Sequence, residues 1–339
     1  QSHMTASFLE TCCLCFLGDL LMRPQLENVL REIEKVIAGK RKAAEKILMA
    51  MLAEGHVLLD DVPGVGKTTL AVALSRAVGL SFRRIQFTPD VLPSDIVGFT
   101  MYEKGSGSFV YRPGVLNHVN LLLGDEINRA ASKTQSALLE AMEERQITVD
   151  GNTYPLEAPF LVIATQNSVG TAGTQILPYA QMDRFLVCLS LGYPDYEAQM
   201  TMLRDRQDTN PLDKVETVLG KEDLIAMQRE VRAITVREVI FDYIVRLATA
   251  SRGHEDVEIG ISPRGALFLD RMAKAKAYLE GRDYVTGADV QDVFMDVCAH
   301  RVLLKEGAGA GTVKQVLEEL LKKVETPDRH SRFPGMLKK

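Results

Sequence analysis

The chain has 339 residues, 46% of them hydrophobic and 25% charged, which is the composition of an ordinary globular protein long enough for two domains. Its formal net charge of −5 argues against nucleic-acid binding as the main activity, because domains that bind nucleic acids usually carry a strong basic excess. No uninterrupted apolar run reaches about eighteen residues, so membrane insertion is not expected.

The first residues are set aside from the fold. Gln1-Ser2-His3-Met4 resembles the remnant of an expression tag, and the apolar segment from Phe8 to Leu21 lacks the basic start of a signal peptide. We therefore interpret residues 1–23 as a tag remnant and an N-terminal extension. The extension is either the product of an upstream start, with Met22 as the natural one, or an arm that packs on the protein.

The five cysteines do not indicate a disulfide framework. Cys12, Cys13 and Cys15 crowd together near the N-terminus, whereas Cys188 and Cys298 fall in apolar segments. The crowded group lacks the second ligand pair of a zinc site, and no pairing pattern is evident. A cytoplasmic location is the expectation that follows.

The first functional motif lies between an apolar run at 56–62, read as a strand, and a segment at 70–78 with helical spacing. Strand, glycine loop and helix together indicate a phosphate-binding loop. The backbone N–H groups of Gly64, Val65 and Gly66 are expected to face nucleotide phosphates, Lys67 to reach the β- and γ-phosphates, and the Thr68 hydroxyl to bind Mg²⁺. The predicted nucleotide-binding residues of this loop are Asp61, Val62, Pro63, Gly64, Val65, Gly66, Lys67, Thr68 and Thr69.

The motif departs from the general pattern at its first position, where Asp61 replaces the usual glycine. The competing interpretation is a glycine turn before an ordinary helix, which leaves the Lys-Thr pair at the helix start unexplained.

A second predicted strand at 120–126 ends in two carboxylates, about sixty residues after the loop. Asp125 is expected to hold Mg²⁺ directly or through water, and Glu126 to polarise the water that attacks the γ-phosphate. Such a pair can also be a simple helix cap. Together with the loop, it predicts hydrolysis of a nucleoside triphosphate.

Two segments have the pattern of β-hairpins. Short alternating runs flank a Gly-Ser-Gly turn within 98–111, and an Asp-Gly turn interrupts 146–154. Either could be an ordinary surface loop.

Polar residues mark the later part of the chain. Asn167 follows an apolar strand at 160–166 and could orient the attacking water or contact the γ-phosphate, although Asn is also common where strands end in turns. Asp183-Arg184-Phe185 leads into the strand at 185–191. Further on, Ser262 is predicted to cap a helix whose first position is Pro263.

The order of elements predicts a parallel α/β sheet followed by helices. Strands at 56–62, 82–87, 120–126, 160–166 and 185–191 alternate with helices, and Gly192-Tyr193-Pro194 marks a break. A helix is also predicted at 25–36, and Gly307–Gly311 is a flexible connector. The helices predicted after the break are 196–207, 221–233, 238–252, 263–280, 287–301 and 311–324.

Taken in chain order, these motifs resemble those of AAA+ ATPases. The resemblance is carried by Asp61–Thr68, Asp125-Glu126, Asn167, Asp183-Arg184-Phe185 and Ser262-Pro263-Arg264. Finer segments resemble the MoxR branch, in which an acidic residue at the position of Asp61 is ordinary. They are Leu59–Gly64, Gln86–Asp90, Leu92–Asp95, Gly124–Ala130 and Ala164–Asn167, and the resemblance as a whole extends from about Pro24 to Pro327.

The resemblance implies an α/β fold with an AAA+ P-loop core at 24–194 and a C-terminal all-helical lid domain at 195–339 that closes over the nucleotide. The core contains a five-stranded parallel sheet with an additional strand between those of Lys67 and Asp125. By this resemblance, the hairpin within 98–111 is an insert in the second helix that is aimed at a central pore. The hairpin at 146–154 is the one that precedes the first sensor. Ile37 lies in the wall beside the adenine.

The resemblance also gives roles to single residues. Glu126, Asn167, Arg184 and Arg264 become catalytic: the water-activating carboxylate, the first sensor, an arginine finger acting on a neighbouring subunit, and a second sensor contributed by the lid. Arg129 is a further candidate for the subunit interface. Arg184 could instead pair with Asp183 at a strand edge, and Arg264 could be a solvated charge at a helix start.

The function implied is that of an Mg²⁺-dependent ATP hydrolase, working as a ring that is a hexamer, with a chaperone-like role. Its implied partners are a von Willebrand factor A domain protein and a client complex. ATP is favoured because no guanine-reading Asn-Lys-x-Asp motif stands in the expected place. Three alternatives stay open: a dedicated motor subunit of a chelatase-like enzyme, a nucleotide-gated scaffold with negligible turnover, and a nucleic-acid motor, which the charge disfavours.

Overall fold

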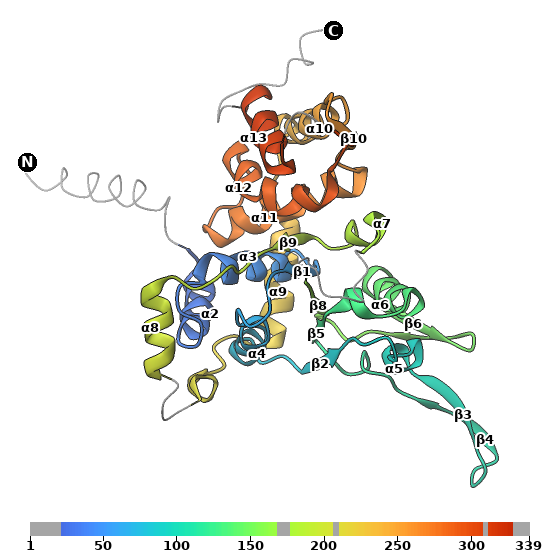
Figure 1. The fold of residues 1–339 in the computed structure, drawn as a ribbon. Coiled ribbons are helices and arrows are strands. Elements are labelled where there is room, and N and C mark those ends of the chain that lie inside the picture. Colours follow the sequence, from blue (N-terminus) through green and yellow to red (C-terminus); the bar gives the residue numbers. More distant parts are fainter. Residues whose placement is uncertain (1–21, 168–176, 206–209, 308–310, 328–339) are drawn as a thin grey trace, which may run out of the picture.

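The computed structural model describes residues 22–167, 177–205, 210–307 and 311–327 (Figure 1). The predictions made for residues 1–21, including the three crowded cysteines, and for most of the Gly307–Gly311 connector lie outside the described residues.

The core is a five-stranded parallel sheet with the strand order β2-β5-β8-β1-β9. All five predicted strands are confirmed, and β8 lies between β1 and β5, where the resemblance places an additional strand. The bounds are β1 Val57–Asp60, β2 Phe82–Gln86, β5 Leu121–Asp125, β8 Leu161–Gln166 and β9 Val187–Leu189.

The central strands are apolar because both faces of the sheet are covered. Leu59 of β1 and Ile163 of β8 pack on one face with helices α2 Pro24–Glu34, α3 Arg41–Leu52 and α4 Lys67–Ala77. Leu58 and Val162 pack on the other face with α5 Pro93–Val97 and α6 Ser132–Glu144. Successive residues of each strand therefore belong to different clusters, and their polar ends meet at one edge of the sheet.

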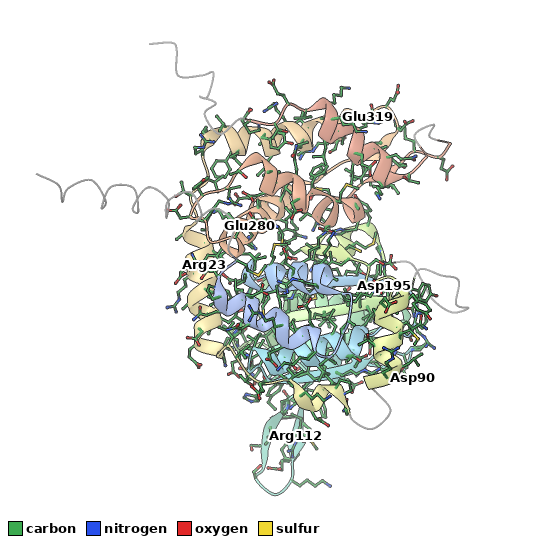
Figure 2. The ribbon with its side chains drawn as sticks, turned by 90° about the vertical axis from the view of Figure 1, so that its left-hand side faces the viewer. Arg23, Asp90, Arg112, Asp195, Glu280 and Glu319 are labelled. Carbon is green, nitrogen blue, oxygen red and sulfur yellow. The ribbon has the colours of Figure 1, made fainter. Side chains whose placement is uncertain are left out.

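Both predicted hairpins are confirmed. β3 Phe99–Glu103 pairs with β4 Ser108–Arg112, and β6 Gln146–Val149 pairs with β7 Asn152–Pro155, each antiparallel. The β3–β4 hairpin projects from the body of the molecule, with Arg112 on it and Glu319 at the opposite end (Figures 1 and 2).

The C-terminal part is mainly helical, as predicted. Its helices are α8 Tyr196–Asp205, α9 Lys221–Ala233, α10 Glu238–Arg252, α11 Pro263–Leu279, α12 Gly287–Cys298 and α13 Val313–Lys323. Shorter helical elements of the chain are α7 Tyr179–Met182 and the 3₁₀ turns Ile127–Arg129, Pro211–Lys214 and Ala299–Arg301. Ser262 caps α11 as predicted, because its Oγ accepts a hydrogen bond from the Gly265 N–H at 2.9 Å.

The prediction that this part is all-helical is wrong in one detail. β10 Val257–Ile259 pairs with β11 Leu303–Leu304 in an antiparallel ladder. Strands of two and three residues are too short to show a period of two. Within the described part of the chain, no helix is long and apolar enough to cross a membrane.

Candidate functional site

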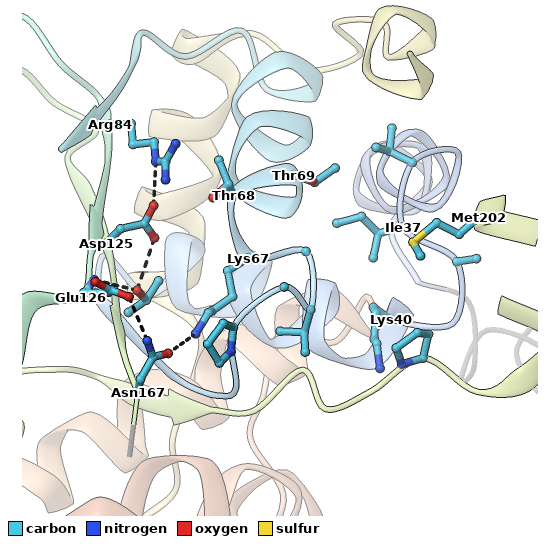
Figure 3. A pocket seen from close by; sticks show the side chains of 18 of the residues that line it. Ile37, Lys40, Lys67, Thr68, Thr69, Arg84, Asp125, Glu126, Asn167 and Met202 are labelled. Atoms are coloured by element: carbon cyan, nitrogen blue, oxygen red, sulfur yellow. Dashed lines mark hydrogen bonds and ion pairs between the residues drawn. The ribbon is translucent and has the colours of Figure 1, made fainter. Parts of the chain in front are cut away.

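A cavity of about 410 Å³ opens where the loop after β1 meets the carboxyl ends of the neighbouring strands (Figure 3). The loop turns sharply because Gly64 and Gly66 have φ values of +84° and +96°, which residues with a side chain rarely adopt. Helix α4 begins directly after, at Lys67, so its free N–H groups face the cavity. Every predicted residue of the loop from Pro63 to Thr69 lines this cavity.

Lys67 stands at the centre of the cavity and is only 9% exposed. Its ammonium donates to the Asp61 carbonyl at 2.8 Å and to Oδ1 of Asn167 at 3.2 Å. Burial is the largest influence on the Lys67 pKa and lowers it, while nearby carboxylates, Asp61 and Asp125 foremost, act in the opposite direction. Both acceptors are neutral oxygens that an anionic phosphate can replace.

Asp125 is held from two sides at the end of β5. Its Oδ2 accepts a hydrogen bond from Nε of Arg84 at 2.6 Å, and its Oδ1 accepts one from the Thr165 hydroxyl at 3.3 Å. The same hydroxyl accepts the backbone N–H of Glu126 at 2.9 Å. Thr165 therefore joins the two carboxylate residues to the neighbouring strand β8.

Glu126 adopts a left-handed backbone with φ +56°, an uncommon conformation for glutamate. Asn167 donates to its Oε1 at 3.0 Å, so Lys67, Asn167 and Glu126 form one hydrogen-bonded chain across the cavity. Gln86 at 3.0 Å and Arg129 at 2.8 Å both contact Oε2. Arg129, the candidate for a subunit interface, pairs with Glu126 of its own chain.

The far end of the cavity is mainly apolar, with Lys40 as its charged residue (Figure 3). Ile37 lies there as expected, with Val36 and Ala38 beside it, and Pro194, Ala198 and Met202 form the opposite wall. Figure 3 shows Ile37 and Met202 on the side away from the carboxylates. This end has the character of a site for a nucleotide base.

Asp61 and Val62 are not among the residues that line the cavity, so their contact with the nucleotide stays a prediction. Val62 packs against the hydrophobic core. Oδ2 of Asp61 accepts the backbone N–H groups of Leu191 and Gly192, the latter at 2.9 Å, and the Ser190 hydroxyl at 3.3 Å. Its carboxylate thus binds the chain segment that follows β9.

The two arginines predicted to be catalytic lie at a second cavity, of about 240 Å³. Arg184 pairs with Glu143 at 3.0 Å, and Arg264 forms a short ion pair with the same carboxylate. Arg264 therefore does not line the nucleotide cavity of its own chain, and its role as a second sensor stays a prediction. The reason is that α11 packs on α12, α9, α10 and α3, which directs its first turn to this cavity.

The alternative pairing of Arg184 with Asp183 is also wrong. Asp183 pairs with Arg301, a fully buried side chain of the lid, at 2.8 Å and accepts the Ser262 hydroxyl at 3.0 Å. The segment that carries Arg184 is therefore fastened to both ends of the α11–α12 helix pair. Arg264, in the first turn of α11, belongs to the same connected unit.

Sequence reasoning missed several residues of the nucleotide cavity: Arg84, Gln86, Thr165 and Met202. Arg84 and Gln86 lie two apart near the end of β2, so the alternation of a strand places them on one face. Nothing in the local sequence indicates that this face meets the ends of β5.

Known proteins resemble this chain over most of its length. Residues 56–187 match the model of the ATPase family associated with various cellular activities, and residues 249–320 match an AAA lid domain. The uncharacterized protein YeaC of Bacillus subtilis is 44% identical, covering 91% of this chain and 97% of that protein. Chaperone MoxR1 of Mycobacterium tuberculosis is 40% identical over 89% of this chain and 82% of its own length.

A solved crystal structure of a presumed ATPase from Cytophaga hutchinsonii has a similar fold, with a TM-score of 0.82 and 36% identity. It covers 90% of this chain, and this chain covers 95% of it. The identities, the coverage and the matched ATPase and lid models agree with one another. The chain belongs to the MoxR family of AAA+ ATPases.

Proposed function

We propose that Glu126 activates the water that attacks the γ-phosphate of ATP, with Asn167 and Lys67 aligning the reacting groups. The observation that supports this is the hydrogen-bonded chain from Lys67 through Asn167 to Glu126 at the mouth of the phosphate loop. Binding of phosphates by Lys67 frees the Asn167 oxygen, which changes how the amide holds Glu126. Occupancy of the loop and the position of the water-activating carboxylate are thereby coupled.

The residues present suit Mg²⁺. The Thr68 hydroxyl and the Asp125 carboxylate both line the cavity, and this ion usually takes one or two protein oxygens and completes its shell with water and phosphates. When bound there, it would neutralise charge on the phosphate oxygens. Arg84, paired with Oδ2 of Asp125 at 2.6 Å, would compete with the ion for that oxygen.

Arg184 and Arg264 are proposed to act on the nucleotide of a neighbouring subunit. Both pair with Glu143 at the second cavity rather than lining the nucleotide cavity of their own chain. An arginine finger supplied by another chain can change turnover by roughly 10³–10⁵. A ring of copies, for which we propose a hexamer, brings the two cavities of adjacent chains together.

The biological role we propose is chaperone-like remodelling or assembly of a client complex in the cytoplasm, with a partner that carries a von Willebrand factor A domain. The name of the relative MoxR1 supports the chaperone part. The β3–β4 hairpin is proposed to face the pore of the ring, and its exposed Tyr102 and Phe109 suit contact with protein. Residues 24–194 and 195–339 are the proposed core and lid domains.

The test mixes two inactive variants. Glu126→Gln cannot activate water, and Arg184→Ala cannot supply the finger, so each alone should hydrolyse ATP at a small fraction of the wild-type rate. In a mixed ring, the intact Glu126 of one chain meets the intact Arg184 of the next, and turnover should recover.

Arg246→Ala is the matched control, because Arg246 forms its ion pair with Asp242 on the exposed surface of α10. This variant should hydrolyse ATP without a partner variant. No recovery in the mixture would contradict the placement of Arg184 in the neighbour's site. Wild-type turnover per chain that is independent of concentration in a confirmed monomer would contradict the ring.

A further inference from the structure

We propose that Asp61 is a positioning residue that sets how firmly the base half of the nucleotide is held. It acts by fastening the phosphate loop to the chain segment that leads into α8. This inference rests on the nucleotide site proposed above and concerns the one position where the loop departs from the general motif.

The carboxylate of Asp61 is fully engaged away from the cavity. Oδ2 accepts hydrogen bonds from the backbone N–H groups of Leu191 and Gly192 and from the Ser190 hydroxyl, while Oδ1 accepts the N–H of Val62 at 3.1 Å. Hydrogen bonds to an ionised acceptor are roughly twice as strong as neutral ones. The glycine of the general motif has no side chain and cannot make any of them.

The segment that Asp61 holds turns at Gly192, where φ is +63°, and then enters α8. The side chain of Asp195 accepts the Ala198 N–H at 2.8 Å, so the helix begins immediately after the turn. Pro194, Ala198 and Met202 all lie on this short stretch and form one wall of the cavity. The position of this wall therefore depends on the position of the turn at Gly192.

The opposite wall is close enough for this placement to matter. A Cβ on Gly39 would lie 3.1 Å from the Ala198 Cβ, so the two walls are in close contact at these two residues. Lys40 also donates to the Tyr193 carbonyl at 2.7 Å. The contacts at Gly39 and Lys40 hold the walls together on one side. Loss of the link at Asp61 therefore lets them separate on the other side, around Met202.

The backbone of Asp61 faces the phosphate end. Its carbonyl accepts the Lys67 ammonium at 2.8 Å. One residue thus contacts both the cation that receives the phosphates and the turn that carries the base wall. Loss of the side chain leaves the first contact in place and removes the second.

This asymmetry gives the experiment. We would measure the affinity of the full-length protein for ATP and for inorganic tripolyphosphate, both with Mg²⁺, by displacement of a fluorescent nucleotide. Asp61→Gly should weaken ATP binding about tenfold and change tripolyphosphate binding less than about twofold, because only ATP uses the base wall. Asp61→Asn keeps one acceptor oxygen and should fall between Asp61→Gly and the wild type.

Two further variants test the route through α8. Ser190→Ala removes only the 3.3 Å contact and should bind both ligands like the wild type. Met202→Ala should weaken ATP binding by itself, and its effect should be much smaller in the Asp61→Gly background, since both changes disable the same wall. Full additivity of the two changes would overturn the inference.

Tripolyphosphate binding also shows that a variant is folded. Equal losses of affinity for ATP and tripolyphosphate in Asp61→Gly would mean that Asp61 shapes the phosphate loop itself. Unchanged affinities would mean that the link to the turn does not affect binding. Either result overturns the inference. If Asp61→Gly does not fold, Asp61→Asn carries the same comparison. A wild type that binds neither ligand, or a Lys67→Met variant that still binds both, refutes the nucleotide site instead.

Discussion

The hydroxyl of Thr165 should be needed for turnover although it does not belong to any predicted catalytic group. Thr165 is 1% exposed on β8, and its Oγ accepts the Glu126 N–H while donating to Asp125. Thr165→Val keeps the volume of the side chain and removes both hydrogen bonds.

The size of the effect follows from these contacts. A buried N–H left without a partner costs about 1–3 kcal/mol, and the 3.3 Å bond to the Asp125 carboxylate adds a smaller amount. We expect the free energy of unfolding to fall by about 2–3 kcal/mol. Because Glu126 holds an uncommon left-handed backbone at that N–H, the loss also lets the backbone that positions its carboxylate shift. Each 1.4 kcal/mol lost from the transition state lowers kcat about tenfold.

The assay is steady-state ATP hydrolysis, with kcat and KM determined separately, beside urea unfolding of the same preparations. Thr165→Val should lower kcat ten- to hundredfold with a smaller change in KM. Thr165→Ser keeps the hydroxyl and is the matched control, with kcat close to that of the wild type. Wild-type kcat in Thr165→Val would refute the role of this hydroxyl in placing Glu126.

Three other outcomes are expected. Arg84→Met frees the Asp125 carboxylate and should lower the Mg²⁺ concentration for half-maximal turnover; an unchanged Mg²⁺ titration would show that the pair does not compete with the ion. Arg301→Met removes a fully buried cation and should cost more than about 3 kcal/mol in urea unfolding, whereas the exposed Arg246→Met should cost less than about 1; similar costs would contradict the burial argument. Burial lowers the pKa of His56 from 6.5 to about 3, so the unfolded chain binds its proton first and the folded state loses stability as pH falls below 6.5. His56→Gln should flatten the fall in unfolding free energy between pH 7 and pH 5, and an unchanged slope would contradict this assignment.

The sheet and the phosphate loop could be predicted because their signals are local. The loop lies within nine consecutive residues, and β5 and β8 are buried on both faces and therefore read as unbroken apolar runs. The carboxylates followed from their place at the end of an apolar strand, about sixty residues after the loop.

What the sequence did not reveal depends on contacts between distant segments. Arg84 meets Asp125 only because β2 pairs with β5, and Met202 reaches the cavity only because the link before α8 folds back on the loop. Asp61 belongs to the loop motif, yet its side chain serves a segment about 130 residues further along the chain. The place of Arg264 depends on how α11 packs, which no local pattern encodes.

The contacts of Asp183 with Ser262 and Arg301 affect which sequence changes such a chain can accept. Asp183 and Ser262 are 79 residues apart in sequence and yet joined by a hydrogen bond, so the chain between them forms a closed excursion through β9, α8, α9, α10 and β10. Arg184 and Arg264 sit at the two ends of that excursion and share Glu143. The spacing of the two arginines is therefore set by the closure of the excursion and not by the length of chain within it. A protein built this way can accept changes at exposed turns of the excursion without moving the two arginines apart.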